Sequence, residues 1–362
     1  MKIAQVAPLY ESVPPKLYGG TERIVAYLSD ALVDLGHDVT LFASADARTK
    51  ARLSPARDQA IRLDPNPLCS DAAAHLTMLH EVRRRASEFD IIHFHVDPMH
   101  LPMFENMAEH TVTTMHGRLD LKDLPELYRC WPQFPLVSIS NDQRRPLPQA
   151  NWLDTIYHGL PLGLIQPGFA PGGYLAFLGR ISPEKRPDRA IEIAVRAGMR
   201  LKIAAKIDKV DEAYWNEVVA PMVGSHPNVE FVGEIGEAAK AEFLGNAHAL
   251  LFPIDWPEPF GLVTIEAMAC GTPVIAFRCG SVPEVIDPGV TGYVVTSVED
   301  AAAMVPLAGK LDRATIRVTF DKRFTAERMA ADYLDIYRNL PGVRAKAGHR
   351  RDAGETSLQE VA

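Results

Sequence analysis

Residues 253–273 read P-I-D-W-P-E-P-F-G-L-V-T-I-E-A-M-A-C-G-T-P. The prolines on either side of Glu258 exclude a helix through the first half of this stretch, because proline lacks the amide hydrogen that a helix needs. Helical spacing of apolar residues follows at 261–269, and short apolar runs at 249–252 and 273–277 flank the segment. The stretch therefore predicts a strand, a loop, a helix and a second strand, which is the repeating unit of a parallel α/β sheet.

The helix start in this stretch is a candidate anion-binding site. In a parallel α/β sheet, the loop after a strand lies at the edge where ligands bind, and the first amides of the following helix have no intrahelical acceptor. A helix start also carries roughly half a positive charge, which favours an anion such as a diphosphate. The amides that we expect beside the anion belong to Phe260, Gly261, Leu262 and Val263.

Glu258 and Glu266 lie on either side of these amides. Because like charges repel, we expect neither carboxylate to bind the diphosphate itself. Glu258 is better placed on the hydroxyls of a sugar ahead of the diphosphate, and Glu266 on the hydroxyls of a ribose behind it. The alternative is that they are an ordinary loop acid and a solvated acid on a helix face.

The spacing of the two glutamates resembles the E-x7-E signature of the retaining glycosyltransferases of family 4, because seven residues separate Glu258 from Glu266. The context P-E-P-F-G-L-x-x-x-E-A-M-A-x-G-T-P-V-I-A makes the match specific, whereas a lone pair of glutamates would be weak. The resemblance implies the α/β GT-B fold, with two facing Rossmann-like doubly wound domains and a C-terminal helix that crosses back to the first. It also implies a nucleotide-sugar donor.

A second segment agrees with this resemblance. Residues 179–185 read G-R-I-S-P-E-K, which is similar to the G-R-x-x-x-E-K segment of the same family. When a sugar leaves a nucleoside diphosphate, negative charge builds on the phosphate oxygens, and fixed cations stabilise that charge. Arg180 can fork onto phosphate oxygens while Lys185 acts as a point charge, so we expect no metal ion and no other cofactor. The alternative is a surface arginine and a lysine at a helix start.

Residues in the first half of the chain complete the expected pocket. Gly19 and Gly20 open a helix after a strand and a loop, where glycine lets backbone amides approach an anion. They resemble the G-G loop that faces the donor diphosphate in the family. The resemblance also implies that His116 reaches the transferred sugar and that main-chain groups near Ile235 pair with the base. The alternatives are a helix start that needs small residues and a structural histidine.

Other patterns have a weaker connection to the family. His93 and His95 alternate along a strand as metal ligands do, but no third ligand has a defined spacing, so we expect packing or acceptor contacts. Residues 157–161 read Y-H-G-L-P, where family members often carry an N-G-[IV]-D run. The missing asparagine and aspartate put in doubt any acceptor or hinge role for this run.

Strand-like and helical runs alternate along the chain in two series, separated by a segment rich in proline and glycine. The first series has strand-like runs at 3–7, 39–43, 91–95, 111–115 and 136–139. The second has such runs at 174–178, 201–205, 229–231, 249–252 and 273–277. We predict an acceptor-side domain at 1–165, a linker at 166–173, a donor-binding domain at 174–322, a crossover helix at 323–340 and a disordered tail at 341–362.

Composition narrows the partners and the location. At 362 residues the chain is long enough for two domains, and its net charge of −8 argues against a nucleic-acid partner. No apolar run approaches the ~20 residues of a membrane span, and no export segment precedes the first strand. We expect a cytoplasmic protein, in solution or in peripheral membrane association at the inner face. The basic runs 83–85 and 144–145 are solvated faces, or they meet that membrane or an anionic acceptor.

These expectations describe a retaining hexosyltransferase. The donor is a nucleoside diphosphate sugar, with uridine and glucose as the leading choice by analogy. The acceptor is a small molecule, a glycan or a lipid-linked molecule held by the first domain. The residues expected to act in catalysis are Arg180, Lys185, Glu258 and His116. The alternatives are a nucleotide-sugar epimerase or a phosphorylase on the same fold, and a non-catalytic protein that binds sugar or nucleotide.

Overall fold

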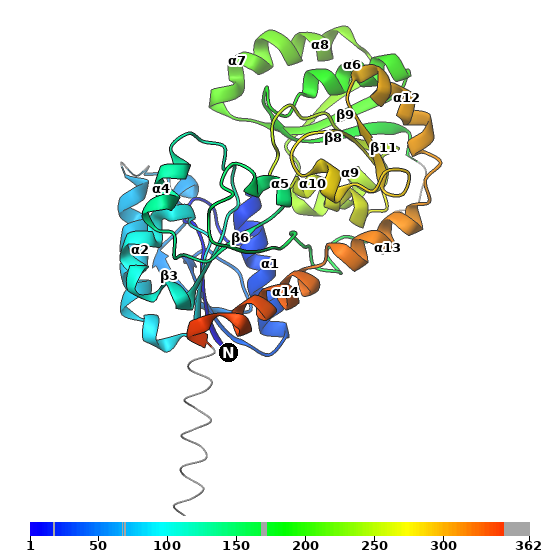
Figure 1. Ribbon diagram of the computed structural model, residues 1–362. Helices are drawn as coiled ribbons and strands as arrows, with labels where there is room; N and C mark the ends of the chain where they lie inside the picture. Colours follow the sequence, from blue (N-terminus) through cyan, green and yellow to red (C-terminus); the bar gives the residue numbers. More distant parts are fainter. Residues whose placement is uncertain (17–18, 67, 69, 168–171, 344–362) are drawn as a thin grey trace, which may run out of the picture.

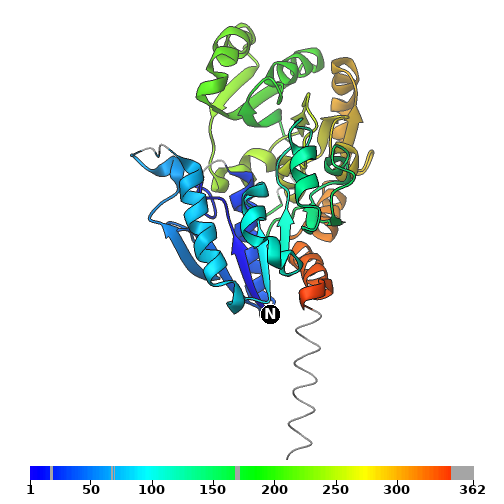
Figure 2. The ribbon, with the colours of Figure 1, turned by 60° about the vertical axis from the view of Figure 1, so that its left-hand side comes forward.

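The structure is a computed structural model that describes residues 1–16, 19–66, 68, 70–167 and 172–343. Over these residues the chain forms two lobes, each built on a parallel sheet with flanking helices (Figure 1, Figure 2). The predicted α/β architecture of two doubly wound lobes is therefore confirmed. Residues 168–171 of the predicted linker and residues 344–362 of the predicted tail lie outside the described residues.

The first lobe orders its parallel strands β3-β2-β1-β4-β5-β6-β7. Its strands are β1 (Lys2–Val6), β2 (Asp38–Ser44), β3 (Arg52–Arg57), β4 (Ile91–Phe94), β5 (Thr111–Thr114), β6 (Leu136–Ser138) and β7 (Trp152–Thr155). Its helices include α1 (Gly20–Asp34), α2 (Asp71–Arg84), the short 3-10 helix η3 (Asp97–His100), α3 (Leu101–Phe104), α4 (Leu124–Cys130) and α5 (Asn141–Arg144). The chain order reverses between β1 and β4, and in such sheets ligands bind at that point.

The second lobe orders its parallel strands β10-β9-β8-β11-β12-β13. Its strands are β8 (Tyr174–Ile181), β9 (Arg200–Ile207), β10 (Val229–Gly233), β11 (Ala249–Phe252), β12 (Val274–Phe277) and β13 (Gly292–Val295). Its helices include α6 (Pro187–Ala197), α7 (Glu212–Tyr214), α8 (Ala220–Ser225), α9 (Glu237–Gly245), α10 (Leu262–Ala269), α11 (Val282–Val285), α12 (Val298–Ala308) and α13 (Arg313–Arg323). Here the order reverses between β8 and β11.

Helix α14 (Ala326–Asn339) connects the end of the second lobe to the first (Figure 1). Its N-terminus is capped by Thr325, whose hydroxyl accepts a backbone hydrogen bond at 3.2 Å. One face of the helix buries Met329, Tyr333 and Tyr337 in the same apolar core as strands β1 and β2. The crossover helix that the resemblance implied is therefore confirmed.

The sequence did not predict the strands β3, β7 and β13, which lie at sheet edges. β3 reads R-L-S-P-A-R and β7 reads W-L-D-T, and neither is fully buried. A central strand of a parallel sheet is covered on both faces and needs a continuous apolar run, as in β4 and β11. An edge strand tolerates polar residues and proline, so it lacks this signal.

The basic runs of the first lobe have partners within the lobe. Arg84 pairs with Glu81 at 3.0 Å and Arg85 with Glu88 at 2.9 Å. Arg144 donates to the Ser138 hydroxyl at 2.7 Å. None of the helices in the described part of the chain combines the length and apolar character that a bilayer crossing requires. Attachment to a membrane surface stays a prediction.

Candidate active site between the two lobes

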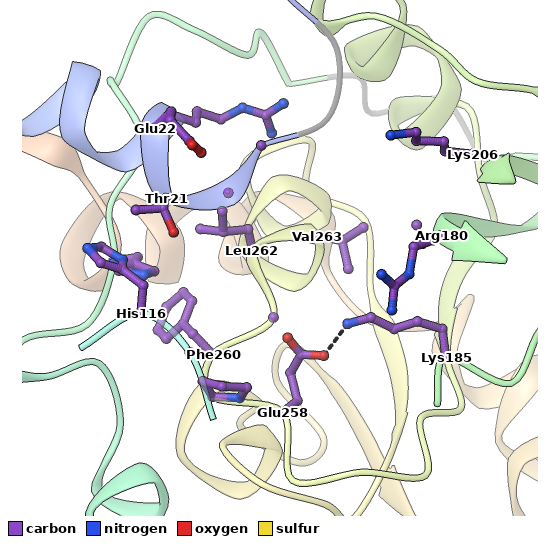
Figure 3. A pocket seen from close by; sticks show the side chains of 18 of the residues that line it. Thr21, Glu22, His116, Arg180, Lys185, Lys206, Glu258, Phe260, Leu262 and Val263 are labelled. Atoms are coloured by element: carbon purple, nitrogen blue, oxygen red, sulfur yellow. Dashed lines mark hydrogen bonds and ion pairs between the residues drawn. The ribbon is translucent and has the colours of Figure 1, made fainter. Parts of the chain in front are cut away.

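A cavity of about 570 Å³ lies between the two lobes. Its walls come from the loops at the carboxyl ends of β1, β4 and β5 on one side and of β8, β9 and β11 on the other. Every site residue predicted from the sequence lines it: Gly19, Gly20, His116, Arg180, Lys185, Ile235, Glu258, Phe260, Gly261, Leu262, Val263 and Glu266. Ten of the lining residues are labelled in Figure 3. The structure brings these residues together, while the role of each stays a prediction.

The loop that carries Glu258 has its shape imposed by two glycines with positive φ. Gly261, at the start of α10, has φ 81°, and a Cβ there would lie 3.0 Å from the Phe252 ring. Gly280 has φ 55°, and a Cβ there would lie 2.4 Å from the amide nitrogen of Glu258. Ser281 reinforces the loop, because its amide donates to the Glu258 carbonyl at 3.0 Å. A side chain at Gly280 would displace the Glu258 backbone, and one at Gly261 would press on the Phe252 ring.

Glu258 and Lys185 meet inside the cavity (Figure 3). The Lys185 ammonium donates to Oε2 of Glu258, and the Trp256 indole donates to the same oxygen at 2.9 Å. The side chains of Lys185 and Glu258 are only 17% and 11% exposed. A cation and a carboxylate thus lie side by side in the cavity, where little water screens them.

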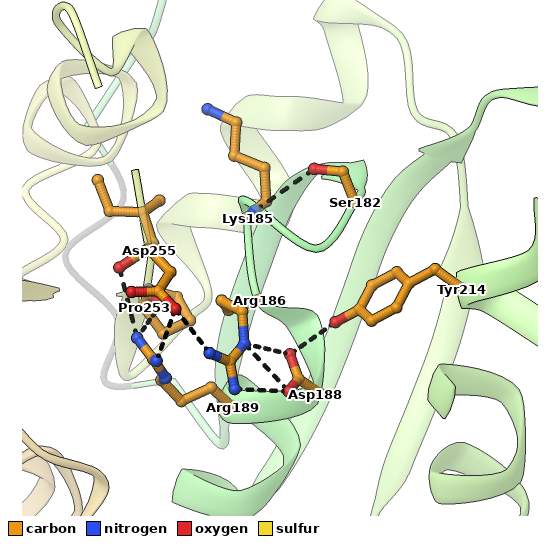
Figure 4. A network of polar contacts seen from close by, with 9 residues as sticks. Ser182, Lys185, Arg186, Asp188, Arg189, Tyr214, Pro253 and Asp255 are labelled. Carbon is orange, nitrogen blue, oxygen red and sulfur yellow. Dashed lines mark hydrogen bonds and ion pairs between the residues drawn. The ribbon is translucent and has the colours of Figure 1, made fainter. Parts of the chain in front are cut away.

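A network of ion pairs holds the turn that carries Lys185 (Figure 4). Arg186 follows it with φ 54°, a left-handed conformation that is uncommon for a residue with a side chain. Its guanidinium donates to Asp188 at 2.8 Å and to Asp255 at 2.9 Å. The Asp255 amide donates to the Glu184 carbonyl at 2.9 Å. The network therefore joins the Lys185 turn to the loop before Glu258.

Arg180 lies at the end of β8, on the same side of the cavity as Lys185 (Figure 3). Its nearest carboxylates are Asp211 at 3.5 Å, Glu184 at 3.6 Å and Asp208 at 3.8 Å. These distances are longer than charge-assisted hydrogen bonds, so the guanidinium keeps capacity for an anion. Lys206, on β9, also lines the cavity and adds a cation that the sequence did not single out.

Glu266 is buried at the lobe interface with two cations around it. Its Oε1 accepts hydrogen bonds from Arg23 at 2.7 Å and from Lys240 at 2.8 Å. Burial alone would raise the pKa of Glu266, but Lys240 and Arg23 hold that pKa below its ordinary value. Arg23 belongs to α1, so the pair crosses between the lobes. Sequence analysis missed Arg23 and Lys240, because neither lies in a recognisable motif.

His116 belongs to a buried group of uncharged histidines. Its Nε2 lies 2.8 Å from Nδ1 of His95, and Nε2 of His95 lies 2.8 Å from the Gln5 side-chain oxygen. Burial lowers the pKa of His116 to about 3, so its ring is neutral at physiological pH. His93 forms hydrogen bonds with the hydroxyls of Tyr337 and Thr114, both at 2.7 Å. His93 is therefore a packing residue, whereas His95 also lines the cavity.

His158 belongs to the run at residues 157–161 that departs from the family pattern. Its ring stacks on His116 with centroids 5.3 Å apart, and it contacts the edge of Phe260 at 5.0 Å. This residue thus packs against His116 and also lines the cavity, which the family motif did not predict. Among the described residues, no group of three or more His, Cys, Asp or Glu side chains is placed to hold a metal ion.

Comparison with known families agrees with this geometry. Residues 170–310 match the family model described as glycosyl transferases group 1, and residues 18–153 match the model described as Glycosyltransferase Family 4. The residues in these two ranges together contribute to both walls of the cavity. The chain belongs to glycosyltransferase family 4.

This family 4 glycosyltransferase is similar to curated relatives over most of their length. It is 27% identical to the D-inositol 3-phosphate glycosyltransferase of Kribbella flavida, over 76% of this chain and 78% of the relative. It is 26% identical to the enzyme of that name from Mycobacterium avium, over 78% of each chain. These identities support glycosyltransferase activity. The acceptor in the relatives' names describes those enzymes and is not assigned to this chain.

Solved structures confirm the fold of this glycosyltransferase. AviGT4, a glycosyltransferase involved in avilamycin A biosynthesis, superposes with a TM-score of 0.69 at 23% identity, over 94% of this chain and 97% of that one. Anabaena HepE, solved with UDP and glucose, superposes with a TM-score of 0.73 at 18% identity, over 94% of this chain and 100% of that one. At these identities the likeness establishes the GT-B fold alone.

A further contact joins the two lobes of this glycosyltransferase. The Glu284 carboxylate, from α11, accepts hydrogen bonds from the amides of Asn141 and Asp142, both at 2.7 Å. It also accepts from the Tyr157 hydroxyl at 3.0 Å. The amides belong to the first turn of α5, whose positive end favours the carboxylate.

Replacing Glu284 with alanine is therefore expected to let the cleft open. We expect the Michaelis constant for the donor to rise about tenfold, which corresponds to about 1.4 kcal/mol, because one of the contacts that join the lobes would be lost. Small-angle scattering should show a larger radius of gyration, and steady-state kinetics should show a smaller change in kcat. Glu299→Ala, which removes an exposed acid from the same lobe, is the control. An unchanged Michaelis constant and radius would contradict this role.

Proposed function

We propose that this glycosyltransferase moves a hexose from a nucleoside diphosphate sugar to an acceptor held by the first lobe, with retention of the anomeric configuration. The observation that carries the proposal is the contact of Lys185 with Glu258, beside the first amides of α10 and inside a cavity shared by both lobes. The Lys185 ammonium suits a phosphate, the Glu258 carboxylate suits sugar hydroxyls, and the two groups are adjacent. This is the arrangement that a sugar bonded directly to a phosphate requires.

The diphosphate would lie against the second lobe. Arg180, Lys185 and the amides of Leu262 and Val263 face the region where negative charge develops as the sugar departs. Each charge-assisted hydrogen bond contributes about 1.5–3 kcal/mol, and more in a site that excludes water. We infer that these groups carry the charge without a metal ion.

The sugar and the nucleoside would lie on either side of the diphosphate. Glu258 would accept hydrogen bonds from hexose hydroxyls, and Glu266 from ribose hydroxyls. Arg23 and Lys240 bind Oε1 of Glu266, which among the described residues leaves Oε2 for the ribose. The main chain near Ile235 would meet the base. For the donor we propose UDP-glucose, because the similar Anabaena protein HepE has been solved in complex with UDP-glucose.

The chemical step then needs no protein base. The bond between C1 of the hexose and the phosphate oxygen breaks, and a bond from C1 to the acceptor oxygen forms on the same face. The acceptor proton passes to the departing phosphate oxygen. His116 is unsuited to take it, because a pKa of about 3 makes the ring a weak base at neutral pH. We assign His116 to a hydrogen bond with the transferred sugar instead.

A donor panel tests the proposed function. We expect UDP to raise the unfolding temperature more than GDP or ADP does, because a ligand that binds only the folded state stabilises it. Incubation with UDP-glucose alone should release glucose slowly, and an excess of EDTA should leave that rate unchanged. Formation of an epimeric nucleotide sugar would identify an epimerase instead. Binding of free sugar, with no affinity for any nucleotide, would favour a sugar-binding protein.

A further inference from the structure

The first-lobe wall of the cavity contains a carboxylate that the donor does not explain. Asp97 begins η3, just after β4, at the point where the strand order reverses. Its backbone has φ 50°. The residue is solvent-accessible and lines the cavity, and the protein around it raises the pKa of the carboxyl by partial desolvation. Among the described residues, its carboxylate has no hydrogen-bond or ion-pair partner. This carboxylate is therefore available to a ligand.

Two more carboxylates lie close to this wall. Glu22 lines the cavity, and burial raises its pKa to about 7, although backbone hydrogen bonds and Arg62 favour the charged form. Glu11 lies behind it and accepts a hydrogen bond from Arg62 at 3.3 Å. Among the described residues that line the cavity, the first lobe contributes two arginines, Arg23 and Arg62. Arg23 pairs with Glu266 of the second lobe, so Arg62 is the cation of this wall. Arg62 forms an ion pair with Glu11 at 3.3 Å, and its side chain is 56% exposed, so water screens its charge.

The remaining polar groups of this wall carry no charge. Tyr10 lines the same wall, Arg62 lies 5.5 Å above its ring, and burial together with nearby carboxylates raises the pKa of its hydroxyl. His75 has both ring nitrogens engaged by backbone groups, at 3.0 Å and 2.8 Å. Burial lowers the pKa of His75, as it does for His116. The wall therefore has a negative balance and several hydrogen-bond acceptors.

We infer that this wall, centred on Asp97, is the acceptor subsite and that it takes an unphosphorylated sugar or polyol. This inference rests on the proposed function and names its second substrate. Asp97 accepts a hydrogen bond from an acceptor hydroxyl, and Tyr10 and Glu22 contact further hydroxyls. A phosphate on the acceptor would meet Asp97, Glu22 and the diphosphate of the donor, with only an already paired arginine to balance them. A phosphate on the acceptor is thus disfavoured at this wall.

Matched acceptor pairs test the inference. With UDP-glucose as the donor, we would compare glucose with glucose 6-phosphate, and myo-inositol with myo-inositol 3-phosphate. For each pair we expect kcat/KM to favour the unphosphorylated member at least tenfold. Asp97→Asn keeps a side chain that tolerates positive φ, and it should lower kcat/KM for that acceptor about 10- to 100-fold. Asp58→Asn, at an exposed position of the same lobe, should leave it unchanged.

The affinity for UDP, measured by calorimetry, separates the two proposals. Loss of UDP binding by the wild type would refute the proposed function itself. With UDP binding intact, three results would overturn the acceptor inference alone. These are preference for the phosphorylated members, an Asp97→Asn variant as active as the wild type, and no transfer to any unphosphorylated sugar or polyol.

Discussion

Replacing Lys185 with alanine is expected to lower kcat/KM for sugar transfer by about 10²- to 10³-fold, because preorganised charge at the leaving group is lost. Lys185 is held beside Glu258 by the Arg186 network, so the effect should come from the missing ammonium and not from a displaced loop. Because the lost interaction strengthens as charge develops, kcat should fall more than the donor affinity. Steady-state kinetics and UDP calorimetry measure the two quantities.

Lys310→Ala is the matched control for this prediction, because it removes an exposed lysine from the same lobe. Circular dichroism and the unfolding temperature should be alike for wild type, control and variant. Arg180→Ala should behave like Lys185→Ala, since both cations face the diphosphate position. Near-normal turnover in both variants would refute the assignment of these cations to the leaving group.

Replacing Glu266 with glutamine is expected to have the largest effect on stability. The change leaves Arg23 and Lys240 buried with one fewer carboxylate, and removal of one partner from a buried ion pair costs about 3 kcal/mol or more. The free energy of unfolding, measured by urea denaturation, should fall by about this amount. UDP affinity should fall as well, because the proposed ribose contact is lost. Glu242→Gln, an exposed site on α9, is the control.

The stability effect of Glu266 should also depend on pH in a defined direction. Lys240 and Arg23 hold the folded-state pKa of Glu266 below its ordinary value, despite burial. Its contribution is therefore fully present above the unfolded-state pKa of about 4.3, and it is lost as the pH falls through the folded-state pKa. The stability difference between wild type and Glu266→Gln should shrink toward acidic pH. A difference that grows there would show that Glu266 is not held ionised.

Several parts of the site could be predicted because they depend on short stretches of chain. The prolines around Glu258 exclude a helix in the loop after β11, and Gly261 marks the start of α10. The charge types of Arg180 and Lys185 follow from the chemistry of a leaving diphosphate. Together with the family resemblance, these local signals led to residues that all line one cavity.

Other parts could not be predicted, because they join residues far apart in the chain. Arg23 reaches Glu266 from the other lobe, and Glu284 reaches the start of α5. His158 lies in a run that departs from the family pattern, and only its stacking on His116 reveals its place. No periodicity or spacing records such contacts, since each depends on how both lobes and α14 pack.

By itself, the sequence determined the alternation of buried strands and helices, the break between the two series and the loop-to-helix unit around Glu258. It could do so because backbone sterics, proline and glycine geometry, and apolar periodicity act over a few residues. Only the tertiary structure decided which charges are neutralised, which histidines are buried uncharged, and that Asp97 faces the cleft without a partner among the described residues. Desolvation and Coulomb interactions depend on distances between lobes, and these exist only after the chain has folded.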